Sequence, residues 1–171
     1  EYIAGKEKKA FYITSDFFSG KLDGIFEFAS LMESLQNFAT DYIPSLSAKP
    51  KQQKIITDPF AYTMGSNFNF EFNLFDSKQI CELFFPELKI ADSTKISGKF
   101  RDNPVSKYLA FDINTKFIEI NDIRTENILV SANTKNNILK TNIFCKNTFI
   151  SESFKIDTLS LLTSTKNDSL N

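Results

Sequence analysis

The last third of the chain, residues 109–170, constrains the fold most, because short segments of β-type residues recur there with polar turns between them. One piece of this sequence returns after 31 residues and aligns Ile128 with Leu159, Val130 with Leu161, and Leu139 with Leu170. The turns at 134–136 and 165–167 both read Thr-Lys-Asn. Two copies of one strand–turn–strand unit explain the match, and a sheet that grows by repetition is its physical meaning. Chance similarity between two turns rich in Asn and Lys is the alternative.

The apolar content is high enough for a large core. The chain has 171 residues, 42% of them apolar, and 19 are Phe. One domain is the usual expectation at this length. Burying one Phe side chain stabilises a fold by roughly 1.5–3 kcal/mol. Because the Phe residues exceed what a compact core of this size needs, some of them are expected to face a groove or a partner.

The charge balance and the absence of His exclude several functions. The 20 basic and 21 acidic residues are evenly spread, so the basic stripe of a nucleic-acid-binding protein is missing. Without His there is no Ser-His-Asp or Cys-His catalysis, and the commonest transition-metal ligand is absent. Asp112, Glu119 and Glu126 have no visible catalytic partner and are expected to be solvated carboxylates. We therefore expect a protein that is not an enzyme and that has no cofactor or metal.

The two cysteines, Cys81 and Cys145, form no CxxC motif. Small buried apolar residues are one interpretation, and a disulfide in an oxidising compartment is the other. No apolar run approaches the roughly 18 residues that a membrane-spanning helix needs.

The first part of the chain combines strands with a helix. Residues 10–29 predict two strands, with a turn at Ser19–Asp23 where two glycines favour chain reversal. A helix is expected at about 30–43, with Ser30 and Glu33 as a capping box and Pro44 as the terminator. Its apolar stripe consists of Leu31, Leu35, Phe38 and Tyr42. The stripe is expected to pack on a sheet, and contact with a membrane surface is the alternative.

Residues 44–66 predict a surface loop, with a short strand at 54–57. Its lysines, Lys49, Lys51 and Lys54, are expected to be solvated, with contact to anionic lipid headgroups as the alternative.

The middle of the chain contains the clearest strand, 67–75, in which Phe68, Phe70, Phe72 and Leu74 share one face. A short helix at about 77–85 follows, capped by Asp76 and ended by Pro86. Strands are expected next at 88–90 and 96–100. Gly98 inside the second of these indicates a bulge, a bend or a close approach of another backbone.

Six further strands are predicted after a loop at 101–104, at 107–113, 117–123, 127–133, 138–145, 149–157 and 159–164. The loops between them are short, which predicts an antiparallel meander, since parallel pairing needs crossovers of a dozen or more residues. The chain divides into a strand–helix–strand–helix half at 1–100 and an Asn-rich meander at 101–171.

One segment resembles a known family. Residues 84–100, "FFPELKIADSTKISGKF", are similar to the helix–Pro–strand step of TamB-like proteins, within the AsmA-like bridge-type lipid-transfer group. The pieces before it fit the same order: "SDFFSGKLDGIFEF", "SLMESLQNFATDYIPSL" and "NFNFEFNL". So do the pieces after it: "IEINDIRTENILVSANTKNN" and "FKIDTLSLLTSTKNDSL".

The resemblance implies an internal fragment of a much longer protein. Proteins of this family are anchored in the inner membrane of Gram-negative bacteria and cross the periplasm as a curved, trough-like β-sheet with an apolar inner face. They support phospholipid transport toward the outer membrane and outer-membrane protein assembly. The fold implied is mainly β, a curved antiparallel meander with two short helices packed on or in the trough. The family's anchor helix and C-terminal domain are not among these residues.

A trough of this kind would bind phospholipid acyl chains by apolar contact, with outer-membrane assembly proteins as further partners. We expect it to be lined by Phe68, Phe70, Phe72, Leu109, Phe111, Ile113, Ile128, Val130, Ala132, Leu159 and Leu161. A closed core filled by the same side chains is the alternative. The competing function is an envelope scaffold that binds proteins through exposed sheet edges, through which the fragment would also self-associate.

Overall fold

The described residues form one open antiparallel sheet with two helices. A computed structural model describes residues 7–42, 65–84, 86–103, 106–135, 138–151, 153–166 and 169–170. Its elements are β1 (Lys9–Thr14), β2 (Phe18–Ile25), α1 (Phe28–Tyr42), β3 (Ser66–Leu74), α2 (Ser77–Phe84), β4 (Leu88–Ile90), β5 (Lys95–Asp102), β6 (Lys107–Ile120), β7 (Ile123–Lys135), β8 (Ile138–Cys145), β9 (Asn147–Ser151), β10 (Phe154–Ile156), β11 (Leu159–Lys166) and β12 (Ser169–Leu170). The predicted mainly-β fold with two short helices is confirmed.

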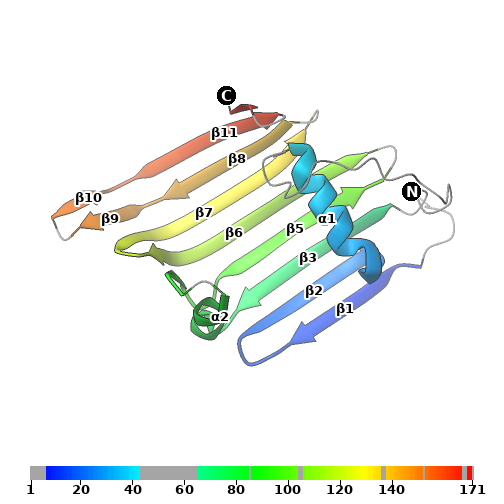
Figure 1. Ribbon diagram of the computed structural model, residues 1–171, viewed down its shortest axis with the longest axis horizontal. Helices are drawn as coiled ribbons and strands as arrows, with labels where there is room; N and C mark the ends of the chain where they lie inside the picture. The colour runs from blue at the N-terminus through cyan, green and yellow to red at the C-terminus, as the bar shows by residue number, and fades with distance from the viewer. Residues whose placement is uncertain are drawn as a thin grey trace.

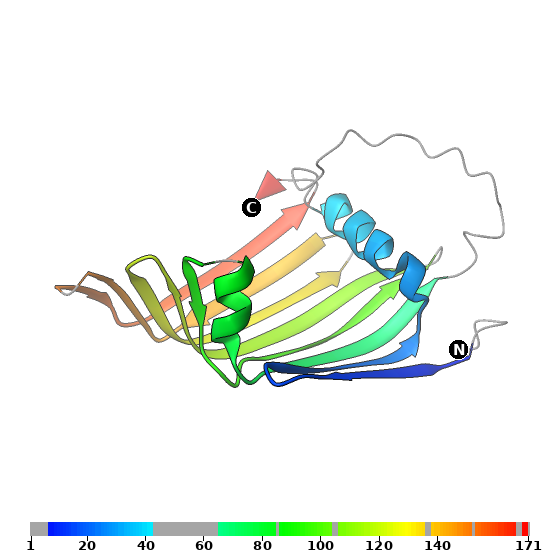
Figure 2. The same ribbon diagram turned by 60° about the horizontal axis from the view of Figure 1, so that its bottom comes forward.

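Neighbouring strands follow the order β1-β2-β3-β5-β6-β7-β8-β11-β12 (Figure 1). Every pairing is antiparallel. The sheet is bowed, and both helices lie on its concave side (Figure 2). We call this side the inner face and the opposite side the outer face. The predicted curved meander is therefore present, and the predicted division at residue 100 falls inside β5, where the sheet continues without a break.

The first hairpin differs from the sequence prediction. The turn lies at residues 15–17, where the Ser15 backbone N–H donates to the Phe18 carbonyl at 2.9 Å. The turn predicted at Ser19–Asp23 is wrong, because Gly20 and Gly24 lie inside β2. Gly20 is there for space: a Cβ at this position would lie 2.7 Å from the Phe72 ring on β3. Gly24 adopts a φ of 152°, which L side chains rarely adopt.

α1 packs its predicted stripe on the inner face. Phe38 and Tyr42 are buried with Leu22, Phe68 and Phe100 of the sheet and with Phe26, which follows β2, and Leu31 and Leu35 pack against this cluster. The Phe38 and Phe100 rings meet edge to face, 5.3 Å between centroids. The helix begins at Phe28, two residues before Ser30, so the predicted capping position is wrong. Pro44, the loop lysines Lys49, Lys51 and Lys54, and the strand predicted at 54–57 lie outside the described residues.

The C-terminal end of α1 is fixed to β6 by an ion pair. Lys107 donates a hydrogen bond to Asp41. Burial by itself lowers the pKa of Lys107, but this hydrogen bond and the negative charges of Asp41 and Asp102 outweigh it, so the pKa is raised. Asp102 is paired with Lys107 across β5 and β6. Burial raises the pKa of Asp102, and the charge of Asp41 adds to the rise while Lys107 partly offsets it.

α2 begins as the sequence predicts. The Asp76 carboxylate accepts hydrogen bonds from the Lys78 backbone N–H and from Gln79 Nε2, both at 3.2 Å. Ser77 ties the helix to the following strand, because its hydroxyl donates to the Ile90 carbonyl and its backbone N–H donates to Asp92. β4 then pairs with Ile118–Ile120 of β6, beyond the part of β6 that pairs with β5. The side chains of the predicted α2 stripe, Ile80, Leu83 and Phe84, lie outside the described ones.

Two strand predictions in the C-terminal half are wrong. The segments predicted at 107–113 and 117–123 form one 14-residue strand, β6, whose turn comes at Asn121 with φ 53°. The strand predicted at 149–157 is instead a hairpin of β9 and β10. Asn tolerates the left-handed turn conformation better than most residues, which suits it to the reversal at Asn121.

The register of the last hairpin agrees with the 31-residue repeat. Thr134 pairs with Leu139 between β7 and β8, and Thr165 pairs with Leu170 between β11 and β12. Both positions move by 31 residues, so the two hairpins start in the same register.

Removing the Phe38 ring should release α1 from the sheet. Phe38 is 3% exposed, so Phe38→Ala leaves a cavity between α1 and Phe100 and is expected to lower the free energy of unfolding by about 3–5 kcal/mol. Urea unfolding monitored by circular dichroism measures this. Gln36→Ala, on the exposed side of the same helix, serves as the control and should change stability by less than about 0.5 kcal/mol.

Asp102→Asn should stabilise the protein at neutral pH. Because the pKa of Asp102 is raised above its ordinary value of 3.8, the folded state binds this proton more tightly, and ionisation costs stability as the pH rises through that window. The melting temperature of the Asn variant should exceed that of the wild type at pH 7 and converge with it at about pH 3. Asp112→Asn, on the exposed outer face, is the matched surface control and should change the melting temperature little.

Candidate functional site

One continuous row of apolar side chains crosses the inner face. Directly paired residues of an antiparallel sheet share a face, so the register identifies the row. From β1 to β11 it consists of Ile13, Gly20, Phe72, Ile96, Ile113, Val130, Ile143 and Leu161. We call these eight residues the apolar row. It runs across the strands rather than along them, and no charged or polar side chain interrupts it.

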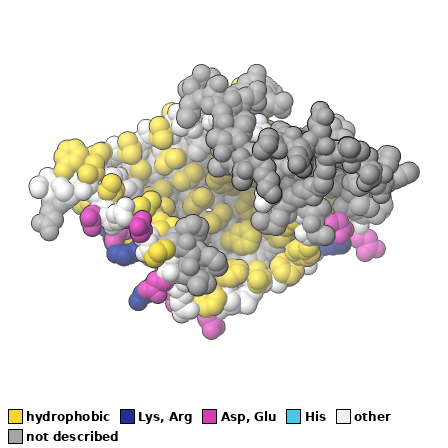
Figure 3. All heavy atoms as spheres, viewed as in Figure 1, with side chains coloured by type: hydrophobic (Ala, Val, Ile, Leu, Met, Phe, Trp, Pro, Cys, Tyr) yellow, Lys and Arg dark blue, Asp and Glu magenta, His cyan; other side chains and the backbone are white. Residues whose placement is uncertain are grey.

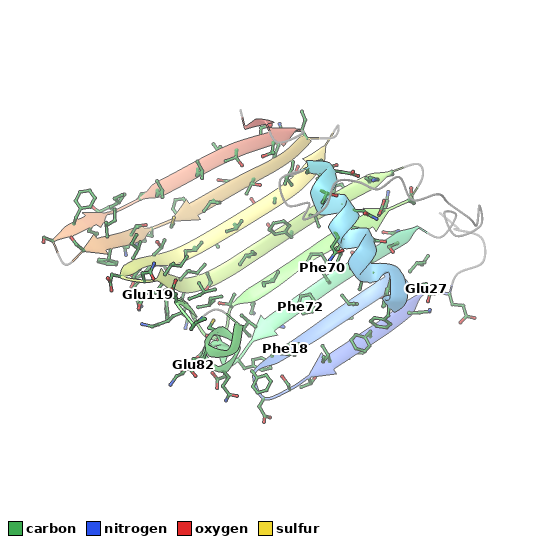
Figure 4. All side chains as sticks on the ribbon, viewed as in Figure 1. Phe18, Glu27, Phe70, Phe72, Glu82 and Glu119 are labelled. Carbon is green, nitrogen blue, oxygen red and sulfur yellow. The ribbon has the colours of Figure 1, made fainter. Side chains whose placement is uncertain are left out.

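The apolar row lies between the two helical regions. On the α1 side, Phe68 and Phe100 are buried at 4% and 0% exposure. On the α2 side, Ala91, Thr94 and Thr115 are buried, and the two Thr hydroxyls lie 2.6 Å apart. Phe72 is half-buried and lies between α1 and α2 (Figure 4). The row is therefore less covered than the residues that flank it toward α1 and toward α2.

Seven of the eight members of the row are at least partly exposed, and Gly20 is buried. The end members of the row are exposed, with Ile13 at 38% and Leu161 at 49%. Phe72, Ile96, Ile113, Val130 and Ile143 are half-buried. Figure 3 shows hydrophobic side chains spread over this face of the sheet. Such a surface offers apolar contact to a ligand or partner.

The sequence-predicted lining residues do not all lie in one place. Phe72, Ile113, Val130 and Leu161 belong to the apolar row itself. Phe70, Phe111 and Ala132 form part of the next row toward α1, where a Cβ at Gly98 would lie 2.4 Å from the Phe70 ring. Leu109 packs against the α1 cluster, and Leu159, 44% exposed, pairs with Cys145.

Three of the predicted lining residues are not accessible, and one of them, Ala132, is 3% exposed. Phe68 belongs to the closed core beneath α1, and Ile128 is 5% exposed and pairs with the buried Thr115. Their placement as open lining is wrong, because alternation along a strand identifies the face but not which part of that face a helix covers. The closed-core alternative therefore holds at the α1 end of the inner face.

Sequence reasoning missed Ile13, Ile96 and Ile143 as members of the row. Ile13 was hidden by the misplaced first turn, which shifts the register of β1 on β2. Ile96 and Ile143 do alternate on their strands, but only the pairing register places them level with Phe72. These residues could have been identified from the sequence only if the pairing register of neighbouring strands had also been predicted.

The outer face is polar at the matching positions. Between the edge strands it carries Lys21, Glu71, Ser97, Asp112, Ser131 and Asn142 in one row. A shallow hollow of about 370 Å³ lies here, with Lys21, Asp23 and Glu71 in its lining. A hydrogen bond from Lys8 lowers the pKa of Asp23 and keeps it ionised. These contacts are those of a solvated, ion-paired surface.

The remaining carboxylates of interest are also surface groups. Asp112 is exposed on the outer face. Glu119 binds Lys89 and Arg124, and the Lys89 hydrogen bond is the main cause of its lowered pKa. Glu126 accepts a hydrogen bond from Arg124 at 3.1 Å, and the Arg124 guanidinium stacks on Phe117 at 4.1 Å. Glu119 and Glu126 are thus surface carboxylates in ion pairs with neighbouring cations.

The structure also places the two cysteines and bears on metal binding and membrane spanning. Cys81 and Cys145 are both buried and carry free thiols. Over the described ranges, no cluster of three or more Cys, Asp or Glu side chains is arranged to bind a metal ion. Neither described helix has both the length and the apolar character needed to cross a membrane.

Comparison of the chain with protein-family models, with curated protein sequences and with solved structures gives no match. The site is therefore interpreted from its own chemistry.

The close fit at Gly98 yields a prediction. Gly98→Val places branched carbons against the Phe70 ring and the Ala110 carbonyl and should lower the free energy of unfolding by roughly 1–3 kcal/mol. Chemical denaturation provides the measurement. Ser97→Val introduces the same side chain on the exposed outer face of the same strand and should stay within about 0.5 kcal/mol of the wild type.

Proposed function

We propose that this chain is a non-enzymatic segment of a lipid-transfer protein and that the apolar row shields acyl chains from water. The single observation that carries the proposal is the unbroken apolar row across eight strands of the inner face. A ligand matched to this surface is long, flexible and apolar, and makes no directional polar contacts.

The free-energy cost of exposing acyl chains to water favours an extended apolar surface. Exposing an acyl chain to water costs about 0.8 kcal/mol per CH₂ group, so a sixteen-carbon chain costs roughly 12 kcal/mol. A protein that moves such a chain through water has to replace the lost contacts along its whole length. A row of half-exposed Ile, Val, Leu and Phe side chains supplies contacts of this kind.

The length of the row supports the same ligand. Strands in a sheet lie about 4.8 Å apart, so eight strands give a row of roughly 34 Å. One leaflet of a bilayer accommodates its acyl chains in about half of the roughly 30 Å hydrocarbon thickness. An acyl chain lying across the strands would therefore contact apolar side chains along its whole length.

The direction of the row explains why repetition is useful. Because the row crosses the strands, each additional strand pair lengthens it by about 10 Å. The 31-residue repeat adds hairpins of this kind. Together with the resemblance to TamB-like proteins, this supports a role in phospholipid transport and outer-membrane biogenesis, within a membrane-anchored protein of the periplasm.

A charge placed in the row tests the proposal. Ile113→Glu puts a carboxylate at the centre of the apolar row and should weaken binding of a fluorescent phospholipid at least about tenfold, because an apolar ligand then desolvates a charge. Asn114→Glu places the same side chain on the exposed outer face one residue later and is the matched control. Circular dichroism checks that both variants fold.

The purified wild-type chain should also carry phospholipid detectable by mass spectrometry. Lipid-free protein that binds no labelled phospholipid contradicts the proposal. Equal loss of binding in Ile113→Glu and Asn114→Glu contradicts the assignment of the row.

A scaffold that binds envelope proteins is the second candidate, and β1, which among the described residues pairs with β2 alone, favours it. Capture of an outer-membrane assembly protein that survives both lipid extraction and Ile113→Glu would support the scaffold instead.

A further inference from the structure

The outer face of β5–β8 carries an excess of positive charge, although basic and acidic residues are evenly spread along the sequence. Among the described side chains, the charged members of this face are Lys95, Lys99, Arg101, Asp112, Lys116 and Lys140. All of them except Asp112 are basic. The whole chain, by contrast, has 20 basic and 21 acidic residues. Folding therefore gathers on one face a charge that the composition does not reveal.

The pairing register sets the spacing of these lysines. Lys99 and Lys140 lie at the two ends of one cross-strand row, with Ala110 and Asn133 between them. Three strand spacings of about 4.8 Å separate the two lysines, which is roughly 14 Å. Lys95 lies four residues before Lys99 on β5, roughly 13 Å along the strand. The positive charges thus cover an area of the face rather than a line.

The exposed lysines of this face are not neutralised by carboxylates. Lysines of other regions do form ion pairs, namely Lys8, Lys9, Lys21, Lys78, Lys89, Lys107 and Lys155. No ion pair between described residues includes the four exposed lysines of this face, Lys95, Lys99, Lys116 and Lys140. Unpaired charges of one sign give a surface a positive potential, which attracts anions.

Two apolar side chains lie exposed among these lysines. Leu129 on β7 and Phe144 on β8 are directly paired, with exposures of 49% and 38%. Lys95 lies in the same cross-strand row, with Asn114 between it and Leu129. Both apolar residues lie on strands that have a neighbour on each side, so their exposure does not come from a sheet edge. The same combination of Lys with exposed Leu and Phe allows amphipathic helices to bind at the surface of a bilayer.

We propose that the outer face of β5–β8 binds an anionic lipid surface. The lysines contact anionic headgroups, while Leu129 and Phe144 enter the boundary between headgroups and acyl chains. Both described helices lie on the concave side of the sheet, so the convex outer face can approach a flat bilayer (Figure 2). This inference goes beyond the acyl-chain surface of the inner face and stands whether or not the apolar row binds lipid.

The kind of cation favours lipid over nucleic acid as the partner. Recognition of nucleic acids relies heavily on Arg, whose planar guanidinium binds phosphate through two hydrogen bonds. On this face the exposed cations are all Lys, and Arg101 is half-buried. Lys acts as a point charge on a flexible stem, which suits the mobile headgroups of a bilayer.

Sedimentation with vesicles tests the role of charge. The chain should bind vesicles of equal parts phosphatidylcholine and phosphatidylglycerol at least about tenfold more tightly than phosphatidylcholine alone. Lys99→Gln and Lys140→Gln should each lower the partition coefficient about fivefold, the effect of one Lys near a charged membrane. Lys78→Gln alters a side chain that is 79% exposed on α2 and is the matched control, which should bind as the wild type does. Raising the ionic strength should weaken binding.

A pair of variants separates this surface from the apolar row. Asn114→Glu places a carboxylate between Lys95 and Leu129 on the outer face and should weaken vesicle binding at least about fivefold. Ile113→Glu places the same group on the inner face and should leave vesicle binding within about twofold of the wild type. With the fluorescent phospholipid the two variants should exchange roles, so failure of one proposal is distinguishable from failure of the other.

Fluorescence tests where the bilayer makes contact. The chain has no Trp, so Phe144→Trp introduces a single reporter, whose emission should shift to shorter wavelength on the mixed vesicles. Tyr12→Trp, at a position 65% exposed on β1, is the control and should not shift. Both positions are exposed, so both variants should fold. No vesicle binding, equal binding to the two kinds of vesicle, or tighter binding to polyglutamate or to a single-stranded oligonucleotide would each overturn the proposal.

Discussion

The register of the cross-strand pairs is the constraint on which the rest of the molecule depends. Side chains alternate between faces along each strand, so a slip of one residue would exchange the apolar and polar faces of a strand. From β1 to β11 the pairs stay in phase, and Phe72, Ile113 and Val130 lie level with one another. On the other face the same register brings Glu71, Ser97 and Asp112 together. One set of hydrogen bonds thus produces both an apolar surface and a polar one.

Aromatic side chains and glycines adjust this sheet to its helices. The core beneath α1 is closed, with the Phe100 ring in contact with the rings of Phe38 and Phe68, and it anchors the helix by burial. Next to it, Gly20 and Gly98 leave space for the rings of Phe72 and Phe70. The rings lie over the neighbouring strands instead of filling a second layer. The inner face is therefore a packed core at the α1 end and a partly exposed apolar surface along the row, and this difference creates the candidate site.

Local chemistry explains which parts of the structure could be predicted from the sequence. The strand at Phe68–Leu74 follows from strict alternation, and the start of α2 follows from Asp76 with Gln79 three residues later. The stripe of α1 follows from its period, although the helix begins two residues early. Gly20 misled the prediction because glycine serves turns and tight ring packing equally well, and only the position of Phe72 distinguishes them. The separation of Phe68 from Phe72 depends on where α1 lies, which no local pattern specifies.

The backbone pairing of the long strands is interrupted along one line across the sheet, and this line divides the sheet into two parts. No pairing is formed at Lys116 and Asn127, β8 gives way to β9 at Lys146, and Asn127 adopts φ 51°. Beyond this line lie β9, β10 and the tip of the β6–β7 hairpin, held by short ladders and ion pairs around Arg124. Local opening follows such boundaries, because few bonds have to break at once. The segment formed by β9, β10 and the tip of the β6–β7 hairpin can therefore open locally. Its amide hydrogens then exchange with solvent while the strands that carry the apolar row remain paired.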